Sequence, residues 1–142
     1  MADLTVEVIP QQQRYGVEDD IPVRVLLTNI SEDPITVNGR LATGGPTGPG
    51  ELRFTVLDPA GSTVPFGARV NMGRPTQTDF AQIPPRGCIG RTIDLVDYYP
   101  LSEPGRYQVS VRYESGTAAE DDWPDGAWQG TVESEPVTIE LS

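Results

Sequence analysis

Carboxylates are the side chains of this sequence that could do chemistry, and they gather in two turn-rich segments. One segment contains Glu18, Asp19 and Asp20, and the other contains Glu120, Asp121, Asp122 and Asp125. Paired carboxylates can hydrolyse glycosides, and about six to eight oxygen ligands hold Ca²⁺. The stretch DDWPDG does not match the EF-hand pattern. Solvated loop charge is therefore the preferred interpretation, Asp121, Asp122 and Asp125 are calcium candidates, and catalysis has the least support.

Residue types that the sequence lacks exclude most catalytic chemistry. Histidine and lysine are absent, and Cys88 is the single cysteine. Ser-His-Asp and Cys-His arrangements need histidine, Schiff-base chemistry needs lysine, and zinc sites need several histidines or cysteines. The glycine-rich segment 44–50 lacks the lysine of a phosphate loop. We therefore predict a protein that is not an enzyme and needs no cofactor, with Cys88 as a small core residue.

Two segments carry candidates for contact with a partner. Residues 40–50 read RLATGGPTGPG and are predicted as a loop. Because loops on a rigid scaffold often carry recognition, partner contacts are expected at Arg40, Leu41, Pro46 and Pro49. Trp123 is a further candidate, since tryptophan is enriched in binding hot spots. The alternatives are a plain connector for the loop and, for Trp123, a side chain that covers a sheet edge.

Charge and hydropathy restrict the partners. The net charge is −11 and the pI is about 4.2, which argues against nucleic acid and against anionic membrane surfaces. No apolar run approaches the roughly 20 residues of a membrane-spanning helix. The start MADLTVEV has neither the basic residues nor the apolar stretch of a secretory signal. A cytoplasmic location is expected, with an extracellular fragment of a larger protein as the alternative.

Period-two alternation of apolar and polar residues is the main structural signal. The length of the chain, 142 residues, suits one domain spanning residues 1–142. Its 15 glycines and 14 prolines favour short strands and turns. We expect strands at 4–8, 21–27, 35–37, 52–56, 87–95 and 107–113, a short one near 68–72, and a strand pair or one bent strand over 128–133 and 137–141. This pattern predicts an all-β fold, an antiparallel sandwich of about seven or eight strands.

Three segments resemble a known class of domains. They are IPVRVLLTNISEDPITV at 21–37, YYPLSEPGRYQVSVRY at 98–113 and AWQGTVESEPVTIEL at 127–141. Together they are similar to bacterial immunoglobulin-like modules of the fibronectin type III and transglutaminase C-terminal kind. The resemblance implies an immunoglobulin-like sandwich with a tyrosine corner at Tyr107.

Weaker similarity extends to two other groups of proteins. One is the β-domain that precedes deuterolysin-type metalloendopeptidases, and the other is the intracellular proteinase inhibitors of bacteria. The chain lacks a His-Glu-x-x-His motif, so it cannot be the peptidase itself.

The first functional hypothesis is a non-catalytic module that binds a protein partner through its end loops or an exposed strand edge. Such an edge would also permit a homo-oligomer. The second hypothesis is an intracellular proteinase inhibitor that presents residues 40–50 to a protease. The third is a carbohydrate- or calcium-binding adhesion or assembly domain, supported by the aromatic and acidic residues around Trp123.

Overall fold

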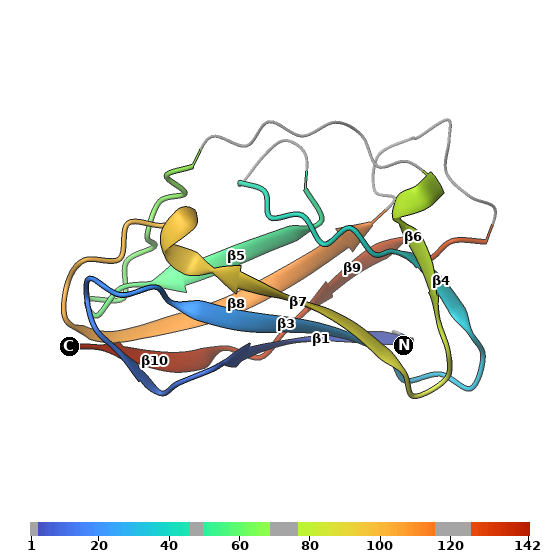
Figure 1. Ribbon diagram of the computed structural model, residues 1–142, viewed down its shortest axis with the longest axis horizontal. Coiled ribbons are helices and arrows are strands. Elements are labelled where there is room, and N and C mark those ends of the chain that lie inside the picture. The colour runs from blue at the N-terminus through green and yellow to red at the C-terminus, as the bar shows by residue number, and fades with distance from the viewer. Residues whose placement is uncertain (1–2, 46–49, 69–76, 116–125) are drawn as a thin grey trace.

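The computed structural model describes residues 3–45, 50–68, 77–115 and 126–142 (Figure 1). These residues form two three-residue 3₁₀ helices, η1 (Gln77–Asp79) and η2 (Leu95–Asp97). Their strands are β1 (Leu4–Pro10), β2 (Arg14–Tyr15), β3 (Pro22–Asn29), β4 (Ile35–Asn38), β5 (Leu52–Leu57), β6 (Phe80–Ile83), β7 (Cys88–Asp94), β8 (Gly105–Ser115), β9 (Gly130–Glu133) and β10 (Val137–Leu141).

Two sheets form the body of the fold, as Figure 1 shows. Sheet A has the strand order β1-β3-β7, and sheet B has the order β2-β10-β8-β5 with β9 also paired to β8. Every pairing in them is antiparallel except that of β2 with β10. A separate antiparallel pair joins β4 to β6. The prediction of an all-β sandwich is confirmed.

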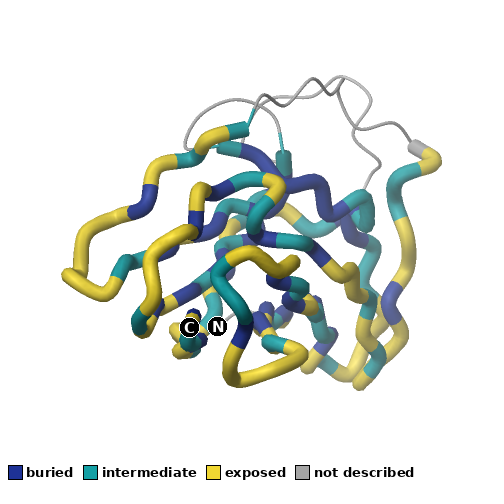
Figure 2. Tube along the Cα trace, turned by 60° about the vertical axis from the view of Figure 1, so that its left-hand side comes forward, coloured by how far each residue is buried: buried dark blue, intermediate teal, exposed yellow. Residues whose placement is uncertain are grey.

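Alternation along the strands builds the core between the two sheets. On the long strand β8, the side chains of Tyr107, Val109, Val111 and Tyr113 are at most 2% exposed, while the residues between them are more accessible. On β1, Leu4, Val6 and Val8 are buried in the same way. Figure 2 shows this alternation as buried and exposed stretches that follow one another along the tube. Burying each such side chain stabilises the fold by roughly 1.5–3 kcal/mol.

The turn after β3 is held by one buried amide. The Asn29 side chain is fully buried, and its Nδ2 donates to the carbonyls of Asp33 at 2.8 Å and Ile83 at 3.0 Å. Its Oδ1 accepts from the backbone N–H and the hydroxyl of Ser31. Asn and Ser side chains commonly bond local backbone in turns of this kind. Because Ile83 belongs to β6, the same amide also fixes the β4–β6 pair to sheet A.

The tyrosine corner is also present. The Tyr107 hydroxyl donates to the Glu103 carbonyl at 2.8 Å, and the ring is 2% exposed. The bond ties the start of β8 to the turn that precedes it.

Three expectations about the strands need correction. No strand was expected in residues 11–20, yet they contain β2, where Tyr15 is 3% exposed and donates its hydroxyl to the Pro22 carbonyl. Strand β6 was not predicted, because its burial does not alternate. Cys88 is exposed rather than buried, because it pairs with Thr28 and shares the outward phase of sheet A. The strand expected near 68–72 falls almost wholly outside the described residues.

Replacing Asn29 tests the role of this amide. Asn29→Ala leaves the buried carbonyl of Ile83 without its donor, so we expect the free energy of unfolding to fall by about 3 kcal/mol. Asn29→Asp keeps an acceptor but removes both donors, and should destabilise the fold comparably. Urea unfolding measures the stability of both variants. Ser102→Ala, which removes the hydroxyl of an exposed serine, is the control. A loss below about 0.5 kcal/mol for Asn29→Ala would contradict this role.

Candidate functional site

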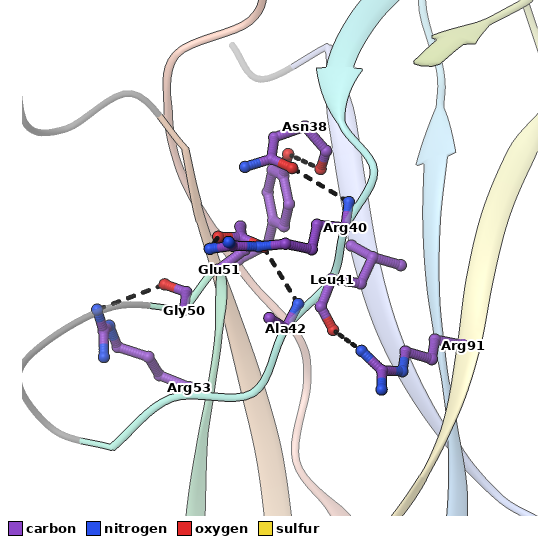
Figure 3. Close-up of polar contacts among 9 residues, drawn as sticks. Asn38, Arg40, Leu41, Ala42, Gly50, Glu51, Arg53 and Arg91 are labelled. Carbon is purple, nitrogen blue, oxygen red and sulfur yellow. Dashed lines mark hydrogen bonds and ion pairs between the residues drawn. The ribbon is translucent and has the colours of Figure 1, made fainter. Parts of the chain in front are cut away.

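Arg40, predicted as a partner contact, instead takes part in an internal ion pair. Its Nη2 lies 2.6 Å from Oε2 of Glu51, and its Nε donates to Oε1 at 2.9 Å (Figure 3). The two side chains are 18% and 6% exposed. This hydrogen-bonded contact with Glu51 is the main cause that raises the pKa of Arg40 above its ordinary value. The same carboxylate accepts from the Ala42 N–H at 3.2 Å.

Leu41 is likewise used inside the fold. Its side chain is 2% exposed, and its backbone has a positive φ of 51°. Its carbonyl accepts from Nη1 of Arg91 on β7 at 3.2 Å (Figure 3). The Leu41 side chain packs into the core and is not presented at the surface of this structure. Contact with a partner at Leu41 stays a prediction.

The other predicted site residues lie outside the described part of the chain. These are Pro46, Pro49, Asp121, Asp122, Trp123 and Asp125. Among the residues that the structure does describe, no three His, Cys, Asp or Glu side chains gather so as to hold a metal ion. The calcium hypothesis stays a prediction.

Asp94, the last residue of β7, and Asp20, before β3, serve local structure. Oδ1 of Asp94 accepts from the N–H of Ile21 at 2.9 Å and from the N–H of Val96 at 3.2 Å. Asp20 lies beside it, and a side-chain hydrogen bond with Asp94 is the first cause that raises the pKa of Asp20. These contacts cap η2 and join it to the start of β3.

On one side of the sandwich, here called the closed flank, the outer edge of β5 is covered. The Glu114 N–H donates to the Glu51 carbonyl, so Leu52, Phe54 and Val56 of β5 direct their peptide groups away from β8. Their carbonyls nevertheless have donors. Leu52 accepts from the Gly44 N–H at 2.9 Å and Val56 from the Val64 N–H at 2.8 Å. The Phe54 carbonyl accepts from the Tyr99 hydroxyl at 3.0 Å.

The opposite side, here called the open flank, consists of β1 and residues 130–137. The Ile30 N–H donates to the Asp3 carbonyl at 2.9 Å, and the register places Thr5 opposite Thr28. Because hydrogen-bonded pairs alternate along an antiparallel ladder, Leu4, Val6 and Val8 direct their peptide groups away from β3. Within the described ranges, no strand pairs with β1 on that side.

Pro10 agrees with this assignment. It falls in the same series as Leu4, Val6 and Val8 and ends β1. A proline lacks the N–H that a ladder bond needs, and in sheets it is found where that N–H would face solvent. Its place in β1 therefore costs no bond to β3.

A groove of about 430 Å³ follows the open flank. Its lining comes from β1 and from the β9–β10 segment: Thr5, Val6, Glu7, Val8, Ile9, Glu133, Glu135 and Val137. Ile9 is 41% exposed, and only Ile9 and Ile30 are exposed large apolar side chains among the described residues. An open strand edge thus lies beside an apolar groove with acidic residues at its rim.

A second concavity, of about 350 Å³, lies over the outer face of sheet B. Arg53 of β5 stands opposite Arg112 of β8 in it. Both guanidinium groups share Glu114, whose carboxylate oxygens lie 3.4 Å and 2.8 Å from their Nε atoms. The two cations are partnered within the chain, so this concavity offers an anionic ligand little.

The helices in the described part of the chain are far too short to cross a membrane. No family model matches the chain, and no curated protein is significantly similar to it. The geometry therefore carries the functional argument.

Sequence reasoning missed both decisive features of the site. Glu51 follows the glycine-rich loop and gave no sign of being 5% exposed. The strand pattern at 4–8 predicted β1, but it did not show which of its edges would lack a partner. Pro10 was the available signal, because a proline at the end of a strand marks an edge position.

Removing Glu51 should destabilise the fold strongly. Glu51→Ala leaves Arg40, whose side chain is only 18% exposed, without its anion, and we expect a loss of about 3 kcal/mol in the free energy of unfolding. The matched control is Glu140→Ala, which breaks the solvent-exposed pair with Arg14 at 3.2 Å and should cost less than about 1 kcal/mol. Chemical unfolding compares the two variants. Equal losses would contradict the structural role of the Arg40–Glu51 pair.

The buried hydroxyl of Tyr113 should make the stability of the fold pH-dependent in the alkaline range. Burial raises the pKa of Tyr113 from 10.0 to about 12, and its hydroxyl donates to the Asn38 carbonyl at 2.8 Å. Because the folded protein holds the proton more tightly, this contribution is complete below pH 10 and is lost as the pH rises toward 12. Between pH 10 and pH 12, the free energy of unfolding of Tyr113→Phe should therefore fall less steeply than that of the wild-type protein. An unchanged slope would contradict the assignment.

Proposed function

We propose that the chain is a non-catalytic interaction module that binds an extended segment of a protein partner along β1. The free edge of this strand is the observation that carries the proposal. An added strand is a recurrent mode of peptide recognition, in which main-chain hydrogen bonds supply affinity and pockets for alternate side chains supply specificity. The open flank offers both parts in one place.

The peptide groups of β1 support a strand of useful length. Leu4, Val6 and Val8 present N–H and carbonyl groups in an alternating row. A partner segment of about five residues would span this row. Residues opposite Val6 and Val8 would direct their side chains into the groove, and their neighbours would lie on the outer face beside Glu7 and Ile9.

The contrast between the two flanks adds to this support. Natural sheets cover or blunt their edges, because a bare edge pairs with other chains. The closed flank follows that rule through Gly44, Val64 and Tyr99. The open flank has Glu7 and Pro10, and no described strand pairs with β1 there. An edge that is left unpaired beside an apolar groove suits reversible binding of a strand.

The residues at the groove favour binding over catalysis. The titratable side chains that line it are Glu7, Glu133 and Glu135, all exposed to solvent. No nucleophile with a neighbouring base accompanies them among the described residues of the lining. The inhibitor hypothesis concerns residues 40–50, of which 46–49 lie outside the described residues, and the carbohydrate or calcium hypothesis concerns residues 116–125, which also lie outside them. Both stay predictions, as does the cytoplasmic location.

Proline substitution separates edge binding from folding. The Val8 N–H faces the groove, so Val8→Pro removes a bond to the incoming strand but no ladder bond to β3. Peptides selected on the wild-type protein from a random display library should bind Val8→Pro at least about tenfold more weakly, near the value of one hydrogen bond. Thr55→Ala, on the outer face of sheet B, is the control that should keep full affinity.

A second measurement does not depend on how well the variant folds. Selected peptides are added to isotopically labelled wild-type protein, and backbone amide shifts are followed by NMR. The proposal expects the largest changes at Val6, Val8 and the β9–β10 segment. Changes confined to residues 40–45 or 62–66, or undiminished binding to folded Val8→Pro, would overturn it.

A further inference from the structure

The rim of the groove carries charge of one sign. Glu7 stands on the outer face of β1, and Glu133 and Glu135 stand on the opposite side of the groove. All three are exposed, and no arginine is among the lining residues. The whole chain has a net charge of −11, so its long-range field has the same sign as the rim.

The cations nearest the groove are directed elsewhere. Arg24 is opposite Ile9 in the register, but its Nε lies 3.5 Å from the position that a Cβ on Gly90 would take. Its side chain therefore leans toward β7 and away from the free edge. Arg112 is held by Glu114 at 2.8 Å and reaches Glu133 only at 4.0 Å, where Glu133 is 70% exposed. The rim charge is largely uncompensated.

We propose that the segment bound at β1 belongs to a different protein and alternates apolar with basic residues. This inference rests on the proposed function of the open flank. A basic side chain opposite Glu7 meets a carboxylate on the outer face. A lysine or arginine directed into the groove lays its aliphatic stem along Val8 and Val137 and its charge near Glu133 or Glu135. Complementary charge selects this partner and speeds its encounter.

A second copy of the chain is a poor occupant by the same reasoning. It would bring another Glu7, Glu133 and Glu135 to the same flank, with no described cation there to meet them. Like charges juxtaposed across an interface suppress association, and the two net charges of −11 add a longer-range repulsion. The acidic rim thus protects the free edge from self-pairing while leaving it available to a basic strand.

Two synthetic peptides test the inference on the full chain. One is a capped peptide of about eight residues that alternates valine with arginine, and the other replaces each arginine with glutamate. The arginine peptide should bind at least about tenfold more tightly, and its affinity should fall as salt shortens the screening length to about 3 Å at 1 M. Its binding should shift the amides of Val6 and Val8.

Neutral variants locate the charge. Glu7→Gln and Glu135→Gln should each weaken binding of the arginine peptide by about threefold, as expected for an exposed ion pair. Glu103→Gln is the control, because Glu103 is an exposed carboxylate in the turn before β8, away from the groove. Equal weakening by all three variants would assign the effect to net charge and would overturn recognition by the rim.

The outcomes distinguish the inference of a basic partner from the proposed function of strand addition at β1. If both peptides bind equally and shift Val6 and Val8, strand addition stands and the basic partner is wrong. If neither peptide perturbs β1, the proposed function falls together with the inference. If the protein alone associates with concentration-dependent protection of Val6 and Val8, a second copy is the occupant and the inference is overturned.

Discussion

Two open antiparallel sheets leave edge strands whose outward peptide groups need partners, and this constraint organises the molecule. On the closed flank, β5 satisfies it with loop backbone at Gly44 and Val64 and with the hydroxyl of Tyr99. On the open flank, the peptide groups of Leu4, Val6 and Val8 point away from β3, and no described strand pairs with them. This difference between β5 and β1 is the basis for proposing that another chain continues sheet A at β1.

The segment after β4 satisfies the same constraint for β5. Glycine and proline in residues 40–50 suggested a recognition loop, yet its first residues cover β5 and reach β7. Glu51 holds Arg40 and the Ala42 N–H, and the Leu41 carbonyl accepts from Arg91 (Figure 3). A buried ion pair is weak evidence for net stability, but breaking one is costly. The pair therefore fixes where the chain crosses the closed flank.

The sequence was informative where structure depends on periodicity and weak where it depends on pairing. Alternation located β1, β3, β5, β8 and β10, because each buries one face of its sheet. Strands β2 and β6 were not predicted, since β2 has only two residues and β6 does not alternate between buried and exposed residues. The outward phase of Cys88 and the burial of Glu51 follow from register and loop crossing, which no local pattern encodes. For the same reason, β1 could be predicted as a strand but not as the free edge.

Amide hydrogen exchange along β1 tests the central claim most directly. If the edge is open, the N–H groups of Val6 and Val8 exchange rapidly, while Thr5 and Glu7, bonded to β3, are protected. The Leu52 N–H, which donates to Ala42 on the closed flank at 3.0 Å, should also be protected and serves as the reference. Protection of Val6 and Val8 equal to that of Glu7 in the dilute free protein would show that the edge is already paired, and would contradict the account.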